Sequence, residues 1–336
     1  MTFHAKTCRA GAWAALAGAA TIVLASAASA QTMREPKATS IEVVVGSQAG
    51  ATPDIFMRKL VKVLADEKLV TLPMVVTPRP GGAWTTASNY VIGKKGEENL
   101  LFSLVPTVFT TPITQGRTNV WDQLTPLAML MRIELLVLVR PDSPWKTLKD
   151  LVEAGKKAER SVKIAGANVG STDHIVVSLI EKAGGIKINF VPFDGGGGAI
   201  NTAFLGGVVD AIVSSVDEAE SLIRGGKARA LGILSESRRT IPDLFKDIPT
   251  AKETGVDVQW GQYYGIAAPP SLDPAVQAWW IDKLTRMNAS AAWKKMIDEA
   301  SQKADFSTGV EARKNMATAY DRFKQVLTDV GLSKQK

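Results

Sequence analysis

Few side chains in this sequence could act as a nucleophile, an acid or a base. His174 is the only histidine after residue 30, and Ser171 lies three positions before it on the same turn of an expected helix. A serine and a histidine at this spacing, without a G-x-S-x-G turn, are weak evidence for a nucleophile. We therefore expect His174 to cap its helix or to contact a ligand, and we predict no catalytic residue.

Metal, cofactor and nucleotide sites lack the residues that they require. Cys8 is the only cysteine, so a zinc site would have one histidine and no thiolate after residue 30. Gly195 to Gly198 form a run of four glycines, but neither G-x-x-x-x-G-K-[ST] nor G-x-G-x-x-G can be drawn through it. Apolar segments adjoin the run on both sides, which disfavours a flexible linker. We predict no metal and no cofactor, and we interpret the glycines as a strand-to-helix turn beside a small ligand.

Four expected strand-to-helix turns are rich in glycine and small polar residues. They are GSQAGATPD at 46–54, TPRPGGAW at 77–84, GANVGSTDH at 166–174 and FDGGGGAIN at 193–201. A helix N-terminus presents unpaired backbone N–H groups and about half a positive charge, and glycine lets a ligand approach the backbone closely. Several such turns that face one cleft could hold a carboxylate or a phosphate without any arginine.

The elements that would position these turns alternate along the chain. SIEVVVG at 40–46 is typical of a strand, and TPDIFMRKLVKVLADE at 52–67 is typical of an amphipathic helix. Thr52 suits the N-cap of that helix and Pro53 its first position. The alternation predicts an α/β protein with parallel sheets covered on both faces, in which ligands bind at the carboxyl ends of the strands.

The first thirty residues are typical of a secretory signal peptide. Lys6 and Arg9 precede an apolar stretch, and Ala28-Ser29-Ala30 matches an A-x-A cleavage signal. A membrane anchor is the alternative, but the stretch is rich in alanine and glycine and is marginal in length for a span. We expect cleavage near Ala30, export to the periplasm and a mature chain of about two domains.

The charge distribution excludes one class of partner. The net charge is +7, but the lysines are spread along the chain with acidic residues between them. Because no basic block is present, we expect no nucleic-acid partner. A mild attraction for anionic solutes is the functional interpretation of the charge.

The order and spacing of the turns resemble the periplasmic solute-binding receptors of tripartite tricarboxylate transporters, the TctC-like or Bug family. The resemblance extends from about Ser40 to Leu332. VPFDGGGGAINTAFLGGVVD is similar to the family pattern VPYKGGGPA followed by GG and VD. Residues that match the shorter motifs of the first three turns are Gly50, Asp54, Arg58, Pro80, Gly81, Gly170, Ser171 and His174.

This resemblance implies a type II periplasmic-binding-protein fold, with two α/β domains, a ligand cleft between them and two crossover strands. We expect domain 1 to comprise residues 31–138 and 258–336, and domain 2 to comprise residues 139–257. The ligand-binding residues implied by the resemblance and the turns are Ser47, Gln48, Gly50, Asp54, Gly81, Gly82, Trp84, Thr107, Gly170, Ser171, His174, Gly197 and Gly198.

The implied function is capture of a small organic carboxylate and its delivery to the membrane permease subunits of a tripartite transporter, by a monomer. The first-domain turns depart from the family, with Gly46-Ser47 in place of Pro-Phe and Gly82-Ala83-Trp84 in place of A-G-G. The solute could therefore be a di- or tricarboxylate or an aromatic acid that stacks on Trp84, or the site could be weakened. A ligand sensor that acts on a signalling receptor and a periplasmic enzyme on the same fold are the alternatives.

Overall fold

The computed structural model describes residues 33–193, 196–239, 243–299 and 303–334. The expected signal peptide lies outside the described residues. So do Asp194 and Gly195, the first glycine of the run. Among the described residues, no helix combines the length and the apolar character that a membrane span needs. Residues 32–336 form one compact unit, so the expected domain boundaries stay a prediction.

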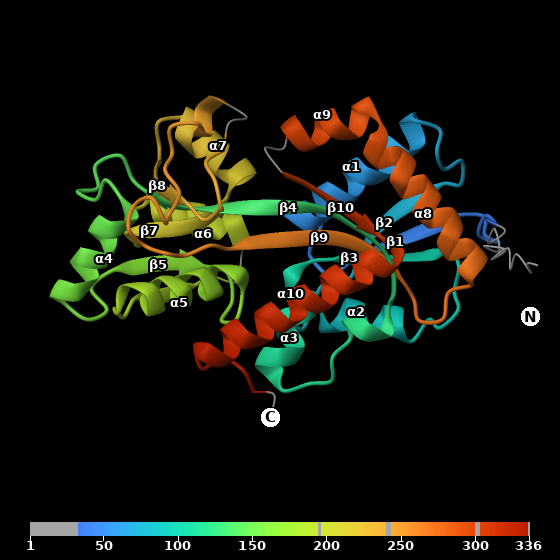
Figure 1. The fold of residues 1–336 in the computed structure, drawn as a ribbon, viewed down its shortest axis with the longest axis horizontal. Coiled ribbons are helices and arrows are strands. Elements are labelled where there is room, and N and C mark those ends of the chain that lie inside the picture. Colours follow the sequence, from blue (N-terminus) through green and yellow to red (C-terminus); the bar gives the residue numbers. More distant parts are fainter. Residues whose placement is uncertain (1–32, 194–195, 240–242, 300–302, 335–336) are drawn as a thin grey trace, which may run out of the picture. The chain divides into compact units, whose positions relative to one another are not determined.

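The strands form two sheets that share one long strand (Figure 1). In the first sheet, β1 pairs in parallel with β2 and β3, while β9 and β10 run antiparallel to β4. The strands of this sheet are β1 (Ile41–Val45), β2 (Met74–Pro78), β3 (Leu100–Leu104), β4 (Thr125–Val139), β9 (Gly261–Ala268) and β10 (Lys303–Thr308). The parallel β1, β2 and β3 bring the turns that follow them to one edge of the sheet.

The second sheet continues from the other half of the shared strand. Leu135 to Val139 of β4 pair with β7, and Leu136 to Val139 also pair with β8. β5 pairs in parallel with β6 and β7. The remaining strands are β5 (Lys163–Gly166), β6 (Asn189–Pro192), β7 (Ala211–Ser215) and β8 (Arg229–Ile233).

The sequence DQLTPLAMLMRIELLVLVRP at 122–141 contains two apolar runs, and the structure joins them into one strand of 15 residues, β4. Thr125 and Arg132 are partly exposed, and every other residue of this strand is buried. Such a continuous apolar run suits a strand covered on both faces. The chain returns to the first sheet beside β4, where Trp260 N donates to Leu234 O and β9 then begins at Gly261.

Helices cover both faces of each sheet. In Figure 1, α1, α8 and α9 lie on one side of the first sheet, and α2, α3 and α10 lie on the other. In the second sheet, Ile200 and Phe204 of α6 share a buried cluster with Val216 and Leu222 of α7. The helices are α1 (Thr52–Asp66), α2 (Thr85–Ile92), α3 (Pro106–Gln115), α4 (Leu148–Lys157), α5 (Thr172–Gly184), α6 (Gly196–Leu205), α7 (Val216–Arg224), α8 (Pro274–Ala289), α9 (Ala291–Glu299) and α10 (Gly309–Asp329).

The start of α1 differs by one residue from the expectation. The N-cap is Ala51, and Thr52 is the first helical residue instead of the cap. The Thr52 hydroxyl donates to Glu218 Oε1 on α7 at 2.9 Å. The Thr52 side chain therefore connects α1, beside the first sheet, to α7, beside the second sheet, and does not cap its own helix.

Two turns of the first sheet pack directly on each other. A Cβ added at Gly46, after β1, would overlap the indole ring of Trp84, which precedes α2. The Trp84 ring also contacts Phe102 of β3, with 6.0 Å between the ring centroids. The two departures from the family pattern, at Gly46-Ser47 and at Ala83-Trp84, are therefore in contact with each other through Gly46 and Trp84.

We expect Gly46→Ala to lower the free energy of unfolding by about 1–3 kcal/mol, because the new methyl group would displace the Trp84 ring. In Trp84→Phe the smaller ring leaves room, so the double variant should lose less than the sum of the two single losses. Urea unfolding measures all three variants. Gly198→Ala is the control, because no atom lies within 4 Å of its added Cβ. Strictly additive losses would show that Gly46 and Trp84 are not coupled.

Candidate functional site

Two adjoining cavities are lined by elements of both sheets. The Tyr264 cavity has a volume of about 130 Å³, and the Lys59 cavity has a volume of about 270 Å³. Thr52, Ile133 and Glu218 line both cavities. The Tyr264 cavity is also lined by Leu135, Ala167, Asp173, Gly197, Ile200, Asn201, Val213, Ser214, Ser215, Gln262 and Tyr264. The Lys59 cavity is also lined by Gly50, Ile55, Phe56, Lys59, Met131, Asp217 and Met296.

Helix N-termini converge on these cavities. Thr52 begins α1, Gly197 is the second residue of α6, and Glu218 is in the first turn of α7. Asp173 lies in the first turn of α5 and lines the Tyr264 cavity. Each helix adds unpaired N–H groups and a partial positive charge at this place. The arrangement is suited to holding an anionic group through the backbone.

The first turn of α6 lies close to the Glu218 carboxylate. A Cβ added at Gly197 would lie 3.3 Å from Glu218 Oε1 and 3.4 Å from Oε2. Because the same Oε1 accepts a hydrogen bond from Thr52, three elements from the two sheets meet at this carboxylate. A side chain at position 197 would fill part of the Tyr264 cavity, which Gly197 lines.

The electrostatics of the Tyr264 cavity are dominated by half-buried acidic groups. Burial raises the pKa of Asp173 to about 6, against a hydrogen bond from Ala167 N. Burial, and then the Asp217 charge, raises the pKa of Glu218. Burial and these two neighbouring carboxylates also raise the pKa of Tyr264, so its hydroxyl stays a hydrogen-bond donor. The helix N-termini and the carboxyl groups thus act in opposite directions on an anionic ligand.

The turn before α5 is held by its own side chains. Asp173 Oδ2 accepts from Ala167 N at 2.8 Å, and His174 Nδ1 accepts from Gly170 N at 3.0 Å. Ser171 is the N-cap, and its hydroxyl accepts from His174 N at 3.4 Å. The imidazole stacks on Phe190 at 4.4 Å, and burial lowers the pKa of His174. A neutral imidazole that accepts at Nδ1 keeps its hydrogen on Nε2.

The turn before α1 is held in the same way. Arg58 donates to both oxygens of Asp54, and Gly50 N donates to Oδ2 at 2.9 Å. Burial opposes ionisation of Asp54, but these hydrogen bonds prevail and lower its pKa. The Asp54 side chain is almost fully buried. Its observed contacts are all within this turn and helix, whereas Ser47 Oγ is buried and has no partner among the described residues.

The turn before α2 has an unusual backbone. Gly81, Gly82, Ala83 and Trp84 all have positive φ angles, of 132°, 56°, 49° and 73°. Trp84 is only 8% exposed because its ring packs on Gly46 and Phe102. Little of the indole face is left for an aromatic ligand in this conformation, so the predicted stacking would require the ring to move.

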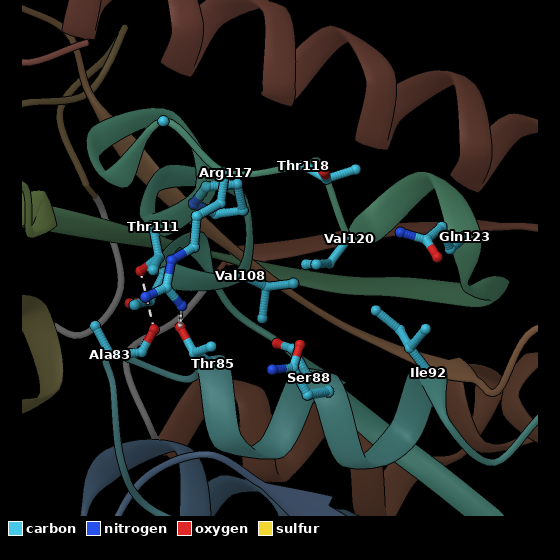
Figure 2. Close-up of a pocket in the computed structure, with 14 residues that line it drawn as sticks. Ala83, Thr85, Ser88, Ile92, Val108, Thr111, Arg117, Thr118, Val120 and Gln123 are labelled. Atoms are coloured by element: carbon cyan, nitrogen blue, oxygen red, sulfur yellow. Dashed lines mark hydrogen bonds between the residues drawn. The ribbon is translucent and has the colours of Figure 1, made fainter. Parts of the chain in front are cut away.

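A third cavity, of about 450 Å³, lies between α2, α3 and the segment 116–123 (Figure 2). Thr107 lines it, and so does Arg117, which donates to Thr85 Oγ1 at 3.4 Å. Thr111 Oγ1 donates to Ala83 O at 2.9 Å. We call it the α2–α3 cavity. It is larger than the Tyr264 and Lys59 cavities, but only elements of the first sheet line it, and fewer helix N-termini meet there.

The predicted ligand-binding residues are divided among these places. Gly197 lines the Tyr264 cavity, Gly50 the Lys59 cavity and Thr107 the α2–α3 cavity. The ligand contacts of all the predicted residues stay predictions. Those whose side chains or backbone line none of these three cavities are Ser47, Gln48, Asp54, Gly81, Gly82, Trp84, Gly170, Ser171, His174 and Gly198.

Sequence reasoning did not identify the turn between β7 and α7. It contributes Ser214, Ser215, Asp217 and Glu218 to the two cavities. The signal was present, because IVSSVDEAE is a further strand followed by a helix, but the turn contains no glycine. Within the described residues, no group of three carboxylate, imidazole or thiol side chains is arranged to hold a metal ion.

The Asp173 carboxyl makes a pH-dependent contribution to stability. Its pKa is about 6 in the folded protein and near 3.8 when unperturbed. The contribution is therefore complete below pH about 4 and is lost as the pH rises through about 6. Relative to Asp173→Asn, the wild-type protein should lose on the order of 2 kcal/mol of unfolding free energy between pH 4.5 and 7.5.

Urea unfolding at several pH values measures this difference. Asp210→Asn is the matched control, because Asp210 also accepts a backbone N–H bond on the second sheet, from Lys163 N. A wild-type protein whose stability relative to Asp173→Asn does not change with pH would show that Asp173 ionises freely.

Comparisons with known proteins agree with this architecture. The family model described as tripartite tricarboxylate transporter family receptor, TctC, matches residues 57–332. Protein BugT of Bordetella pertussis is 27% identical over 271 residues, which cover 78% of this chain and 79% of BugT.

Solved structures of other proteins share the fold. An R. palustris protein solved with adipate has a TM-score of 0.78 at 19% identity, over 88% of this chain and 98% of that chain. MatC from Rhodopseudomonas palustris, with bound malate, has a TM-score of 0.73 at 22% identity, over 86% and 98% of the two chains. These similarities confirm the predicted α/β periplasmic-binding-protein fold. The family model covers most of the chain, which therefore belongs to the TctC family of tripartite tricarboxylate transporter receptors, solute-binding proteins and not enzymes.

Proposed function

We propose that this protein captures a small organic carboxylate in the Tyr264 and Lys59 cavities and delivers it to the membrane permease of a tripartite transporter. It does so as a monomer in the periplasm, after removal of residues 1–30. The convergence of the α1, α6 and α7 N-termini on one space is the observation that carries the proposal. Such N–H groups can bind a carboxylate without an arginine.

Neutral donors supplement the backbone at this place. The Asn201 and Gln262 amides and the Tyr264 hydroxyl line the same cavity as Gly197. Several hydrogen bonds to a charged oxygen are sufficient for a micromolar dissociation constant, which corresponds to about 8 kcal/mol. The two solved relatives with adipate and malate bind small dicarboxylates, which supports an organic acid of similar size.

Closure of the two halves is expected to accompany binding. The Thr52–Glu218 hydrogen bond spans the two sheets, and both residues line both cavities. A solute can favour this closed arrangement only by binding it more tightly than an open one. The N-terminus of α1 lies on one side of the cavities, and those of α6 and α7 lie on the other. Because only the closed arrangement lets all three contact one solute, they make the closed state bind it more tightly than the open state.

We expect at least one small carboxylate to bind with a micromolar dissociation constant. The protein is unfolded and refolded to remove any solute that it carries, and mono-, di-, tri- and aromatic carboxylates are then tested by calorimetry. A solute at 100 times its dissociation constant should also raise the unfolding free energy by about 2.7 kcal/mol. A folded protein that binds none of these acids would contradict the proposed function.

Gly197→Val should weaken binding of that acid at least about 100-fold, which corresponds to about 2.7 kcal/mol, because its side chain would enter the space beside Glu218. Thr202→Val is the matched control, since Thr202 is an exposed residue of the same helix whose hydroxyl donates only to Gly198 O. Thermal unfolding verifies that both variants are folded. Wild-type affinity in folded Gly197→Val would exclude this location for the site.

A further inference from the structure

The lining of the two cavities carries more negative than positive charge. Among the described residues that line them, Asp173, Asp217 and Glu218 contribute three carboxyl groups, and Lys59 is the only cation. In the described part of the chain, no lysine or arginine forms an ion pair with any of the three carboxyl groups. These carboxyl groups are therefore offset only by the partial charges of the helix N-termini, and not by a paired lysine or arginine.

One buried polar atom and one further polar group at this place lack hydrogen-bond partners among the described residues. Asp217 Oδ1 is buried, and no described residue donates to it. Tyr264 is 5% exposed and lines the cavity, yet its hydroxyl bonds to none of the described residues. Buried polar groups in proteins are normally paired. An unpaired carboxylate oxygen needs a donor, and an unpaired phenol can supply one.

The Glu218 carboxylate already has a defined role as an acceptor. Thr52 Oγ1 donates to its Oε1 at 2.9 Å. Glu218 Oε2 faces the first turn of α6, where a Cβ at Gly197 would lie 3.4 Å away. Asp217 precedes it on the first turn of α7 and lines the Lys59 cavity. Two adjacent carboxylates thus face the solute space from one helix.

The charge balance discriminates between classes of acid. A simple dicarboxylate would bring two further negative charges to a place with uncompensated carboxylates, and like charges in a partly buried site repel each other. An ammonium group lowers the net negative charge of an acid by one, and its cation would offset the half-buried carboxylates. These carboxylates then gain a cationic partner only when the solute is bound.

We propose that the solute is an organic acid that also carries a protonated amine, and that the Asp217 and Glu218 carboxylates bind this amine. The carboxylate of the same solute lies at the first turn of α6, with the Tyr264 hydroxyl and the Gln262 amide as donors. This inference rests on the proposed function, because it specifies the class of acid that the same cavities take.

Calorimetry on the refolded protein tests the inference with pairs of acids. The amine-bearing member either adds an ammonium group to the same carbon chain or carries it in place of one carboxylate at the end of the same methylene chain. The pairs are propionate and alanine, succinate and aspartate, glutarate and 4-aminobutyrate, and adipate and 5-aminopentanoate. In the pair that binds, the amine-bearing acid should bind at least about tenfold tighter. Glu218→Gln and Asp217→Asn should each weaken its binding about tenfold or more, and should strengthen binding of the amine-free partner.

Glu220→Gln is the matched control, because it removes one carboxylate from the same helix, where Glu220 pairs with Arg224. It should leave the affinity for both members of each pair unchanged. Equal or tighter binding of the amine-free acids by the wild-type protein would overturn the inference and leave the proposed function intact. Failure of every acid of both kinds to bind would overturn the proposed function as well.

Discussion

The participation of β4 in both sheets is the constraint on which the proposed ligand space depends. Its first half pairs with β9 and β10, and its second half pairs with β7 and β8. Ile133 and Leu135, which lie near the junction of the two sheets, line the Tyr264 cavity. Because this one buried strand joins the sheets, the turns of both sheets are held around a common space, and the Thr52–Glu218 hydrogen bond can connect them.

That space combines two opposing electrostatic features. The helix N-termini favour an anion, as expected for a receptor of organic acids. The carboxyl groups of Asp173, Asp217 and Glu218 oppose one, and burial holds the pKa values of Asp173 and Glu218 above their ordinary values. A solute that presents a carboxylate to the helix ends and a cation to the α7 carboxylates satisfies both features. In the proposed account the fold provides for capture of an acid, and the side chains of α7 select which acid.

The sequence predicted the alternation of strands and helices, the fold and three of the turns that surround the cavities, because these depend on local pattern. It did not predict the positions of Trp84 and Thr52, because both depend on distant partners, Gly46 and Glu218. The two apolar runs of β4 were not recognised as one strand, since no local signal shows that a strand belongs to two sheets. Asp217 and Glu218 were missed because acidic residues at a helix start are ordinary complements to the helix dipole.

Hydrogen exchange with and without the tightest-binding acid tests the central claim most directly. If the solute occupies the space between the two sheets, protection should rise together in the N-terminal turns of α1, α6 and α7, because these backbone N–H groups come from both sheets. Protection confined to the N-terminal turns of α2 and α3 would place the solute in the α2–α3 cavity and contradict the account.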